Sequence, residues 1–243
     1  MAATSSCQRQ VRHASAAAAG PANNPAMPRK PAPLRRKPSG RYHHGDLRAA
    51  LLDAAWSALE RGGVEAVSLR SLASALGVSY AAPANHFPSK EDLLDALRLT
   101  GWTRFADALE PRSEDPHVLR ASGLAYIGFA LAHPHVLRLM FSPSARGPTP
   151  AVHEQAQRAW GNLLRAVALH LGRGVADERT LASLAVAAWA QVHGLAMLWT
   201  DVTLPPEMAD PATAEHLRSV ALDVLVAGID ASAGRPRRAR RRA

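Results

Sequence analysis

Closely spaced start and stop signals divide residues 46–92 into short helices, and this pattern restricts the fold more than any other feature of the chain. Asp46 can cap a first helix whose apolar stripe ends at Gly62-Gly63. Ser68 can cap a second, shorter helix. Gly77 ends that helix, because glycine adopts the positive φ of a tight helix end without steric cost.

The signals that follow predict two more helices and a tight turn. Ser79 can cap a third helix over 80–86, and Ser89 begins a fourth with acidic residues in its first turn. Ala73 is small where the second and third helices would cross, and Val78 fills the gap between them. Together these features predict a helix-turn-helix.

The rest of the chain is rich in Ala and Leu and predicts further helices. The expected fold class is all-α, with an N-terminal three-helix helix-turn-helix domain and a C-terminal helical bundle. The last two helices have broad apolar faces with small residues, which could form a two-fold interface between subunits or only close the core of one subunit. The helices expected in this half cover residues 117–132, 134–141, 150–171, 178–200 and 211–232.

Basic residues are concentrated at both ends of the sequence. The net charge is +9, yet residues 45–234 carry 15 basic and 20 acidic residues. We expect two disordered polycationic tails that attract polyanions, nucleic acid more readily than an anionic membrane. The N-terminal arm shares the composition of transit peptides, but its prolines break an amphipathic helix. The expected domains are a basic arm over 1–40, a helix-turn-helix domain over 41–105, a ligand-binding and dimerisation domain over 106–233, and an Arg-rich tail over 234–243.

The composition also excludes several classes of protein. No apolar run is long enough for a membrane span, and the single cysteine, Cys7, rules out a disulfide framework or a cysteine-based zinc site within one chain. The histidine pairs His43-His44 and His133-Pro-His135 lack a carboxylate at metal-ligand spacing. Because the chain also lacks a phosphate loop and a nucleophile elbow, we expect no enzyme, no cofactor and no metal.

Residues 42–104 resemble the DNA-binding domain of the TetR family of bacterial transcriptional regulators. The resemblance is carried by Tyr42-His-His-Gly-Asp-Leu-Arg48, by Val67-Ser-Leu-Arg-Ser-Leu-Ala73 with Leu76-Gly-Val-Ser79, and by His86-Phe-Pro-Ser-Lys-Glu-Asp-Leu-Leu94. Further along, Trp189-Ala-Gln-Val-His193-Gly194 resembles the Trp-His-Gly signature of one subfamily of TetR C-terminal domains. The resemblance implies a homodimeric regulator, usually a repressor, that a small ligand releases from its operator in the bacterial cytoplasm, where it is associated with the nucleoid.

The segment that would read DNA bases departs from the family pattern. Residues 80–86 contain no Lys or Arg, so a bidentate arginine contact to guanine cannot come from this segment. Asn85 could bind an adenine instead, or Asn85 and His86 could only support the turn at Phe87. The resemblance makes Lys90 the strongest backbone contact. The expected DNA contacts are Arg41, Ser68, Arg70, Ser79, Tyr80, Ala81, Ala82, Asn85, His86 and Lys90.

Large side chains in the C-terminal half are candidates for an apolar ligand pocket. Methionine and aromatic side chains line adaptable pockets, and they equally fill ordinary cores. The candidates are Tyr126, Phe129, Met140, Phe141, Trp160, Trp189, His193 and Met197.

The sequence as a whole predicts a sequence-specific DNA-binding transcriptional regulator that dimerises through its last two helices. We expect a repressor that a small, largely apolar ligand releases from double-stranded DNA. Two alternatives stay open. The chain could bind nucleic acid non-specifically through its basic tails, with a vestigial helix-turn-helix, or it could bind a ligand without acting on DNA.

Overall fold

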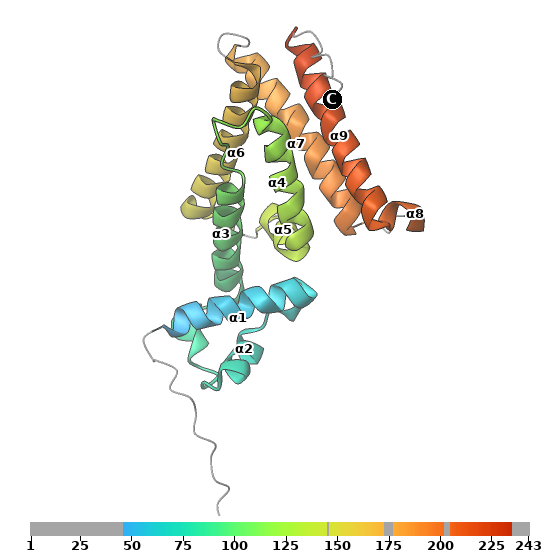
Figure 1. The fold of residues 1–243 in the computed structure, drawn as a ribbon. Helices are drawn as coiled ribbons and strands as arrows, with labels where there is room; N and C mark the ends of the chain where they lie inside the picture. The colour runs from blue at the N-terminus through green and yellow to red at the C-terminus, as the bar shows by residue number, and fades with distance from the viewer. Residues whose placement is uncertain (1–45, 145, 173–176, 202–204, 235–243) are drawn as a thin grey trace, which may run out of the picture. The chain divides into compact units, whose positions relative to one another are not determined.

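The computed structural model describes residues 46–144, 146–172, 177–201 and 205–234, and every regular element within them is a helix (Figure 1). This confirms the all-α fold class. Cys7, Arg41 and the two basic tails, apart from Gly234, lie outside the described residues. The elements are α1 (Leu47–Gly62), η1 (Val64–Ala66), α2 (Leu69–Leu76), η2 (Pro83–Asn85), α3 (Lys90–Ala108), α4 (Val118–Ala132), α5 (Pro134–Phe141), α6 (Pro150–Leu171), α7 (Glu178–Asp201), α8 (Pro206–Ala209) and α9 (Pro211–Ser232).

Three of the predicted caps begin the helices at the expected residues. The Asp46 carboxylate accepts a hydrogen bond from the backbone N–H of Ala49 (3.1 Å), and Ser68 Oγ accepts one from Ser71. Ser89 Oγ accepts a hydrogen bond from the Asp92 N–H (3.2 Å) at the start of α3. Such caps satisfy N–H groups that have no partner within the helix. Gly77 ends α2 in the left-handed conformation, with φ of 68°.

The third predicted helix is shorter than expected and is not an α-helix. Residues 80–82 form a turn, and η2 (Pro83–Asn85) is a 3₁₀ helix in place of an α-helix over 80–86. The backbone hydrogen bonds from Ala82 to Ser79 and from His86 to Pro83 span three residues rather than four. Pro83 accounts for the difference, because it has no N–H to give to the carbonyl of Ser79, which would be the first α-helical hydrogen bond of a helix capped by Ser79.

In the C-terminal half, each predicted helix is present with ends within one residue of those expected. The sequence prediction missed α8, a single turn that begins at Pro206 inside a stretch interpreted as a break. Proline suits the first position of a helix, because the N–H that it lacks would have no helical partner there.

The described helices pack around one continuous hydrophobic core. Helix α3 lies along α6, and α4 packs against α6, α7 and α9. Gly123 permits the close approach of α4 to α9, since a Cβ at this position would lie 2.5 Å from Leu222 Cδ2. Helix α7 packs against both α4 and α9, and α6 also contacts it (Figure 1).

Helix α7 is long and apolar enough to cross a membrane by length and composition alone. The bent pair of α4 and α5 passes the same test when it is counted as one span. The buried side of α7 packs within the helical core, where Leu184, Ala185 and Ala188 are buried. An apolar core helix satisfies such a test without any membrane.

Candidate nucleic-acid interface and apolar cavity

The turn before η2 and η2 itself expose a row of side chains on the surface of the helix-turn-helix. Tyr80 is 63% exposed, and Ala81, Asn85 and His86 are also exposed. Ala82 is half-buried. Phe87 fixes the segment to the fold, because it is only 2% exposed and packs in the hydrophobic core. The predicted base-reading residues thus lie on one accessible segment that is fixed by a buried aromatic ring.

Cationic side chains flank this segment without ion-pair partners. Within the described part of the chain, neither Arg70 nor Lys90 forms an ion pair, and Arg70 lies over the ring of Tyr80 at 5.1 Å. Lys90 occupies the first position of α3, where helix N–H groups also favour an anion. Ser68 and Ser79 complete the predicted set, Ser68 half-buried as a cap and Ser79 exposed. These groups can bind phosphates.

Arg48 is an additional candidate that the sequence prediction did not include. Its guanidinium lies over the Phe87 ring at 5.1 Å, and it forms no ion pair among the described residues. The side chain is exposed in the first turn of α1. Its position beside the Tyr42–Leu47 stretch was the available signal, but spacing alone does not show that α1 brings it to Phe87.

The first two turns of α3 are tied to the segment that follows α5. Arg98 is 5% exposed and forms ion pairs of 2.7 Å with Glu91 and with Asp95. Ser144 donates to Glu91 (3.3 Å), and Arg146 forms an ion pair with Asp92 (2.8 Å). The hydrogen bond from Ser89, together with Arg146, lowers the pKa of Asp92. The carboxylates beside Lys90 therefore already have cationic partners.

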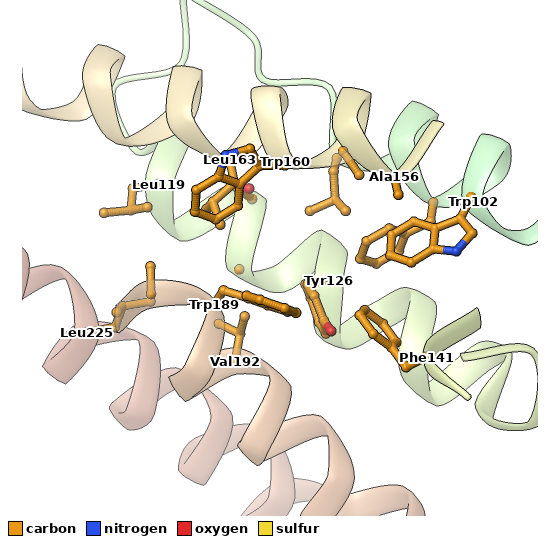
Figure 2. A pocket seen from close by; sticks show the side chains of 16 residues that line it. Trp102, Leu119, Tyr126, Phe141, Ala156, Trp160, Leu163, Trp189, Val192 and Leu225 are labelled. Atoms are coloured by element: carbon orange, nitrogen blue, oxygen red, sulfur yellow. The ribbon is translucent and has the colours of Figure 1, made fainter. Parts of the chain in front are cut away.

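An apolar cavity of about 260 Å³ lies in the C-terminal half of the fold (Figure 2). Trp102 and Phe141 lie at one end of it, and Leu119 and Leu225 lie at the other. Its walls come from α3, α4, α6, α7 and α9, with Phe141 at the end of α5. The lining residues are Trp102, Phe105, Leu109, Leu119, Ser122, Gly123, Tyr126, Phe141, Ala156, Ala159, Trp160, Leu163, Ala188, Trp189, Val192 and Leu225.

Half of the predicted pocket residues lie in this wall, namely Tyr126, Phe141, Trp160 and Trp189. The other half do not line the cavity. Phe129 is buried with its ring 5.1 Å from that of Phe105, and Met140 is buried against Gly101. Met197 packs against the core. These side chains are located where an ordinary core needs large apolar groups, which is the alternative that their composition left open.

His193 lies one layer behind the wall and supports it. The Tyr126 hydroxyl and His193 Nδ1 are 2.6 Å apart, and the imidazole ring is 4.9 Å from that of Phe141. Burial lowers the pKa of His193, against a smaller opposing effect of the Asp201 charge. Burial also raises the pKa of Tyr126. Both groups are therefore neutral near pH 7, and the tautomer of His193 decides which of them donates the hydrogen bond.

The sequence prediction missed the contribution of α3 to the cavity. Trp102, Phe105 and Leu109 follow helical spacing and line the wall, but the boundary expected at residue 105 falls inside α3. The first residue of the same helix is Lys90, in the helix-turn-helix. The apolar spacing at 102, 105 and 109 was the signal, and the expected boundary at residue 105 divided it between the two domains.

Two family models match the chain. The model described as "Bacterial regulatory proteins, tetR family" matches residues 51–97, and "Tetracyclin repressor-like, C-terminal domain" matches residues 119–226. The chain belongs to the TetR family. The first TetR match lies within residues 42–104, and the second includes α7 with its Trp189–Gly194 stretch.

Solved structures agree with the assignment to the TetR family. A protein of unknown function from Rhodococcus sp. RHA1 is 35% identical, with a TM-score of 0.64 and a match over 78% of this chain and 98% of that chain. Two less similar structures share the fold. A TetR-family transcriptional regulator from Streptomyces coelicolor has 18% identity, a TM-score of 0.55 and coverage of 77% and 86%. A TetR variant from Acinetobacter baumannii AYE in complex with minocycline has 23% identity, a TM-score of 0.52 and coverage of 75% and 96%.

No sequence among the curated proteins matches the chain. TetR-family members are non-enzymatic, DNA-binding regulators of transcription, and this chain has the fold and both domains of the family. It is accordingly a DNA-binding transcriptional regulator by family.

Proposed function

We propose that the chain is a dimeric repressor that binds an operator through its helix-turn-helix and is released by a small, largely apolar ligand in the cavity. One observation carries the proposal: α3 begins at Lys90 in the helix-turn-helix and ends in the cavity wall at Trp102 and Phe105. A ligand in the cavity therefore contacts the same helix, α3, whose first residue is the predicted phosphate contact Lys90. We assign DNA binding to residues 41–105 and ligand binding with dimerisation to 106–233, acting in the bacterial cytoplasm.

Operator recognition would combine backbone and base contacts. Lys90, Arg70 and Arg48 are cations without ion pairs among the described residues, which suits them to phosphates. Asn85 and Tyr80 are the exposed groups that can reach base edges in the major groove. Since no arginine is available for guanine within 80–86, we expect A·T base pairs to dominate the contacted part of the operator.

Dimerisation through α7 and α9 is supported by apolar side chains that the single chain leaves exposed. Val186 and Leu198 on α7 are 50% and 47% exposed, and Val220 and Val224 on α9 are 43% and 60% exposed. Only 28% of the most apolar stretch of α7 is buried within the chain. A two-fold axis beside α7 and α9 would cover these side chains with their counterparts in a second subunit.

Release would follow from a shift between two arrangements of the dimer. Operator binding places the two recognition segments about one DNA turn apart, roughly 34 Å. A ligand that binds more tightly to another arrangement lowers operator affinity, and a coupling of about 1–3 kcal/mol makes a measurable switch. The minocycline complex of the Acinetobacter baumannii TetR variant supports a small-molecule role for this fold.

Non-specific binding through the basic tails is the second candidate function. It is favoured by the absence of Lys and Arg from residues 80–86 and by six arginines within residues 235–243. Each phosphate contact contributes about −0.9 to the slope of log affinity against log salt, so the tails could dominate that slope.

Fluorescence anisotropy of the full chain separates the two functions. The probes are a duplex from the protein's own upstream region and a scrambled duplex, each at two salt concentrations. We expect Asn85→Ala to reduce the affinity for the upstream duplex by about tenfold and to leave the affinity for the scrambled duplex unchanged. Lys90→Ala should lower the affinity for both duplexes by the same factor. It should also reduce the slope of log affinity against log salt by about 1.

The control variant is Arg179→Ala, which removes an exposed arginine at the start of α7. If the unmodified chain binds both duplexes equally, and only removal of the basic tails abolishes binding, the tails are the DNA-binding element. The repressor proposal is then wrong.

A further inference from the structure

The cavity wall contains no ionisable acid or base apart from the Tyr126 phenol. Its lining residues include no Asp, Glu, Lys, Arg or His. A charged ligand would leave water without gaining a counter-charge, which costs several kcal/mol. Tyr126 stays protonated because burial raises its pKa. The ligand that this wall favours is electrically neutral.

Six aromatic side chains give the wall its shape. Trp102, Phe105 and Phe141 meet at one end, with ring centroids of Trp102 and Phe141 5.1 Å apart in an edge-to-face arrangement. Trp160 and Trp189 lie between the two ends and meet edge to face, with ring centroids 6.5 Å apart (Figure 2). The wall presents ring edges and ring faces to the cavity, so it favours a ligand that contains a flat aromatic ring. Each aromatic pair stabilises the complex by about 0.5–1.5 kcal/mol beyond the effect of the buried area.

The volume limits the number of rings. An apolar cavity of about 150 Å³ accommodates one benzene molecule. By proportion, a cavity of about 260 Å³ takes about ten non-hydrogen atoms, which corresponds to two fused rings. A ligand of one ring would leave contacts unmade, and a ligand of four rings would require the wall to open.

Ser122 supplies one polar position in this apolar wall. The residue is only 7% exposed and lines the cavity, and its hydroxyl has no hydrogen-bond partner among the residues that the structure describes. The Tyr126 hydroxyl differs, since it already has a hydrogen bond with His193. A ligand oxygen in the cavity can give this hydroxyl a hydrogen bond that the surrounding side chains do not supply.

We propose that the effector is an uncharged, planar aromatic compound of about two fused rings, with a single hydroxyl or carbonyl group that hydrogen-bonds Ser122. This inference rests on the proposed role of the cavity as the effector site. It specifies the chemical class of the ligand and the residue that orients it.

Isothermal titration calorimetry of the full-length protein with four probes of similar size tests this class. The probes are 2-naphthol, 2-methylnaphthalene, N-methylquinolinium and 1-decanol. We expect 2-naphthol to bind about fivefold more tightly than 2-methylnaphthalene, which corresponds to one net hydrogen bond. The N-methylquinolinium cation should bind at least tenfold more weakly than 2-methylnaphthalene, the neutral two-ring probe of the same size. Tighter binding of 1-decanol or of the cation than of 2-naphthol would overturn the proposal.

Substitution of the serine tests its assignment. Ser122→Ala should lower the affinity for 2-naphthol by about fivefold and leave the affinity for 2-methylnaphthalene unchanged. The two probes should then bind with equal affinity. Ser183→Ala is the matched control, because Ser183 is exposed on α7 and its hydroxyl donates to the backbone of Arg179. A preference for 2-naphthol that survives Ser122→Ala excludes Ser122 as its partner.

Anisotropy with the upstream duplex separates this inference from the proposed function. If 2-naphthol binds as expected but leaves DNA affinity unchanged, the ligand class stands and the release mechanism fails. If an apolar compound of another class releases DNA while 2-naphthol does not bind, the release mechanism stands and the ligand class fails.

Discussion

At the scale of single residues, the pair of Tyr126 and His193 shows how burial sets a protonation state. The hydrogen bond between them is 2.6 Å long, and the neighbouring aromatic rings partly shield the imidazole from water. Desolvation disfavours the charged imidazolium, so the pKa of His193 falls below its usual value of 6.5. The folded protein therefore prefers His193 without its second proton.

This preference predicts a specific dependence of stability on pH. Above pH 6.5 the imidazole is neutral in both the folded and the unfolded chain, and its contribution to stability is complete. As the pH falls below that value, the unfolded chain binds the proton first, and stability is lost until the pH passes the lowered pKa of the folded state. We expect His193→Gln to lack this loss, measured as the free energy of unfolding in urea between pH 8 and pH 5.

His153→Gln provides the control for this measurement, because His153 is exposed on α6. That variant should keep the pH dependence of the original chain. An identical slope in His193→Gln and in the original chain would contradict the assignment.

The individual site residues also show where the sequence was sufficient. The four caps and stops at Asp46, Ser68, Gly77 and Ser89 depend only on neighbours in the chain, and the sequence predicted all four. Ser122 and Arg48 acquire their importance from residues far away in the sequence. Ser122 has no local pattern that distinguishes it from other serines, and the motif that ends at Arg48 does not show the contact of Arg48 with Phe87.

At the scale of elements, the packing of α4 against α9 depends on one glycine. Gly123 is buried, and the side chain of Leu222 occupies the space that a Cβ at this position would need. Gly128 lies on the same helix, and a Cβ there would have nothing within 4 Å. The two glycines therefore separate the effect of close packing from the effect of helix propensity.

Alanine substitution at these two positions should change stability in opposite directions. We expect Gly123→Ala to destabilise the fold by about 1–3 kcal/mol, because α9 must move away from α4. Gly128→Ala should stabilise it by about 0.5–1 kcal/mol, since alanine favours the helix. Thermal and urea unfolding measure both changes. If Gly123→Ala is also stabilising, α9 does not pack as closely as described.

The recognition element shows the limit of helix prediction from caps alone. Ser79 is a good capping residue, yet the segment that follows forms a turn and η2 rather than an α-helix. Capping preference competes there with the restrictions that Pro83 places on its neighbours, and the proline determines the outcome. The ends of the long C-terminal helices were easier to predict, because apolar periodicity over many residues outweighs any single residue.

At the scale of the whole molecule, the exposed side chains of α7 and α9 determine how the chain behaves in solution. Val224 is 60% exposed in the middle of α9, and Val186 is 50% exposed on α7. Helices α7 and α9 also pack against each other, which is the arrangement that the proposed interface needs. The proposed dimer would bury these side chains.

Charge at this proposed interface should separate the subunits. We expect Val224→Arg to convert the dimer into a monomer, measured by sedimentation equilibrium of the full chain. Because a monomer contacts only one half-site, its operator affinity should fall by about a hundredfold. Leu169→Arg is the control, since Leu169 is 39% exposed on α6 and the proposed dimer does not use it. A dimer that persists in Val224→Arg would place the interface elsewhere.

The length of α3 has a mechanical consequence. From Lys90 to Phe105 the helix rises about 22 Å, so a tilt of about 5° around its Phe105 end moves Lys90 sideways by about 2 Å. A displacement of that size breaks a charge-assisted hydrogen bond to a phosphate. In the proposed release mechanism α3 would act as a lever arm, because a small rotation at its Phe105 end would move Lys90 far enough to lose its contact with a DNA phosphate.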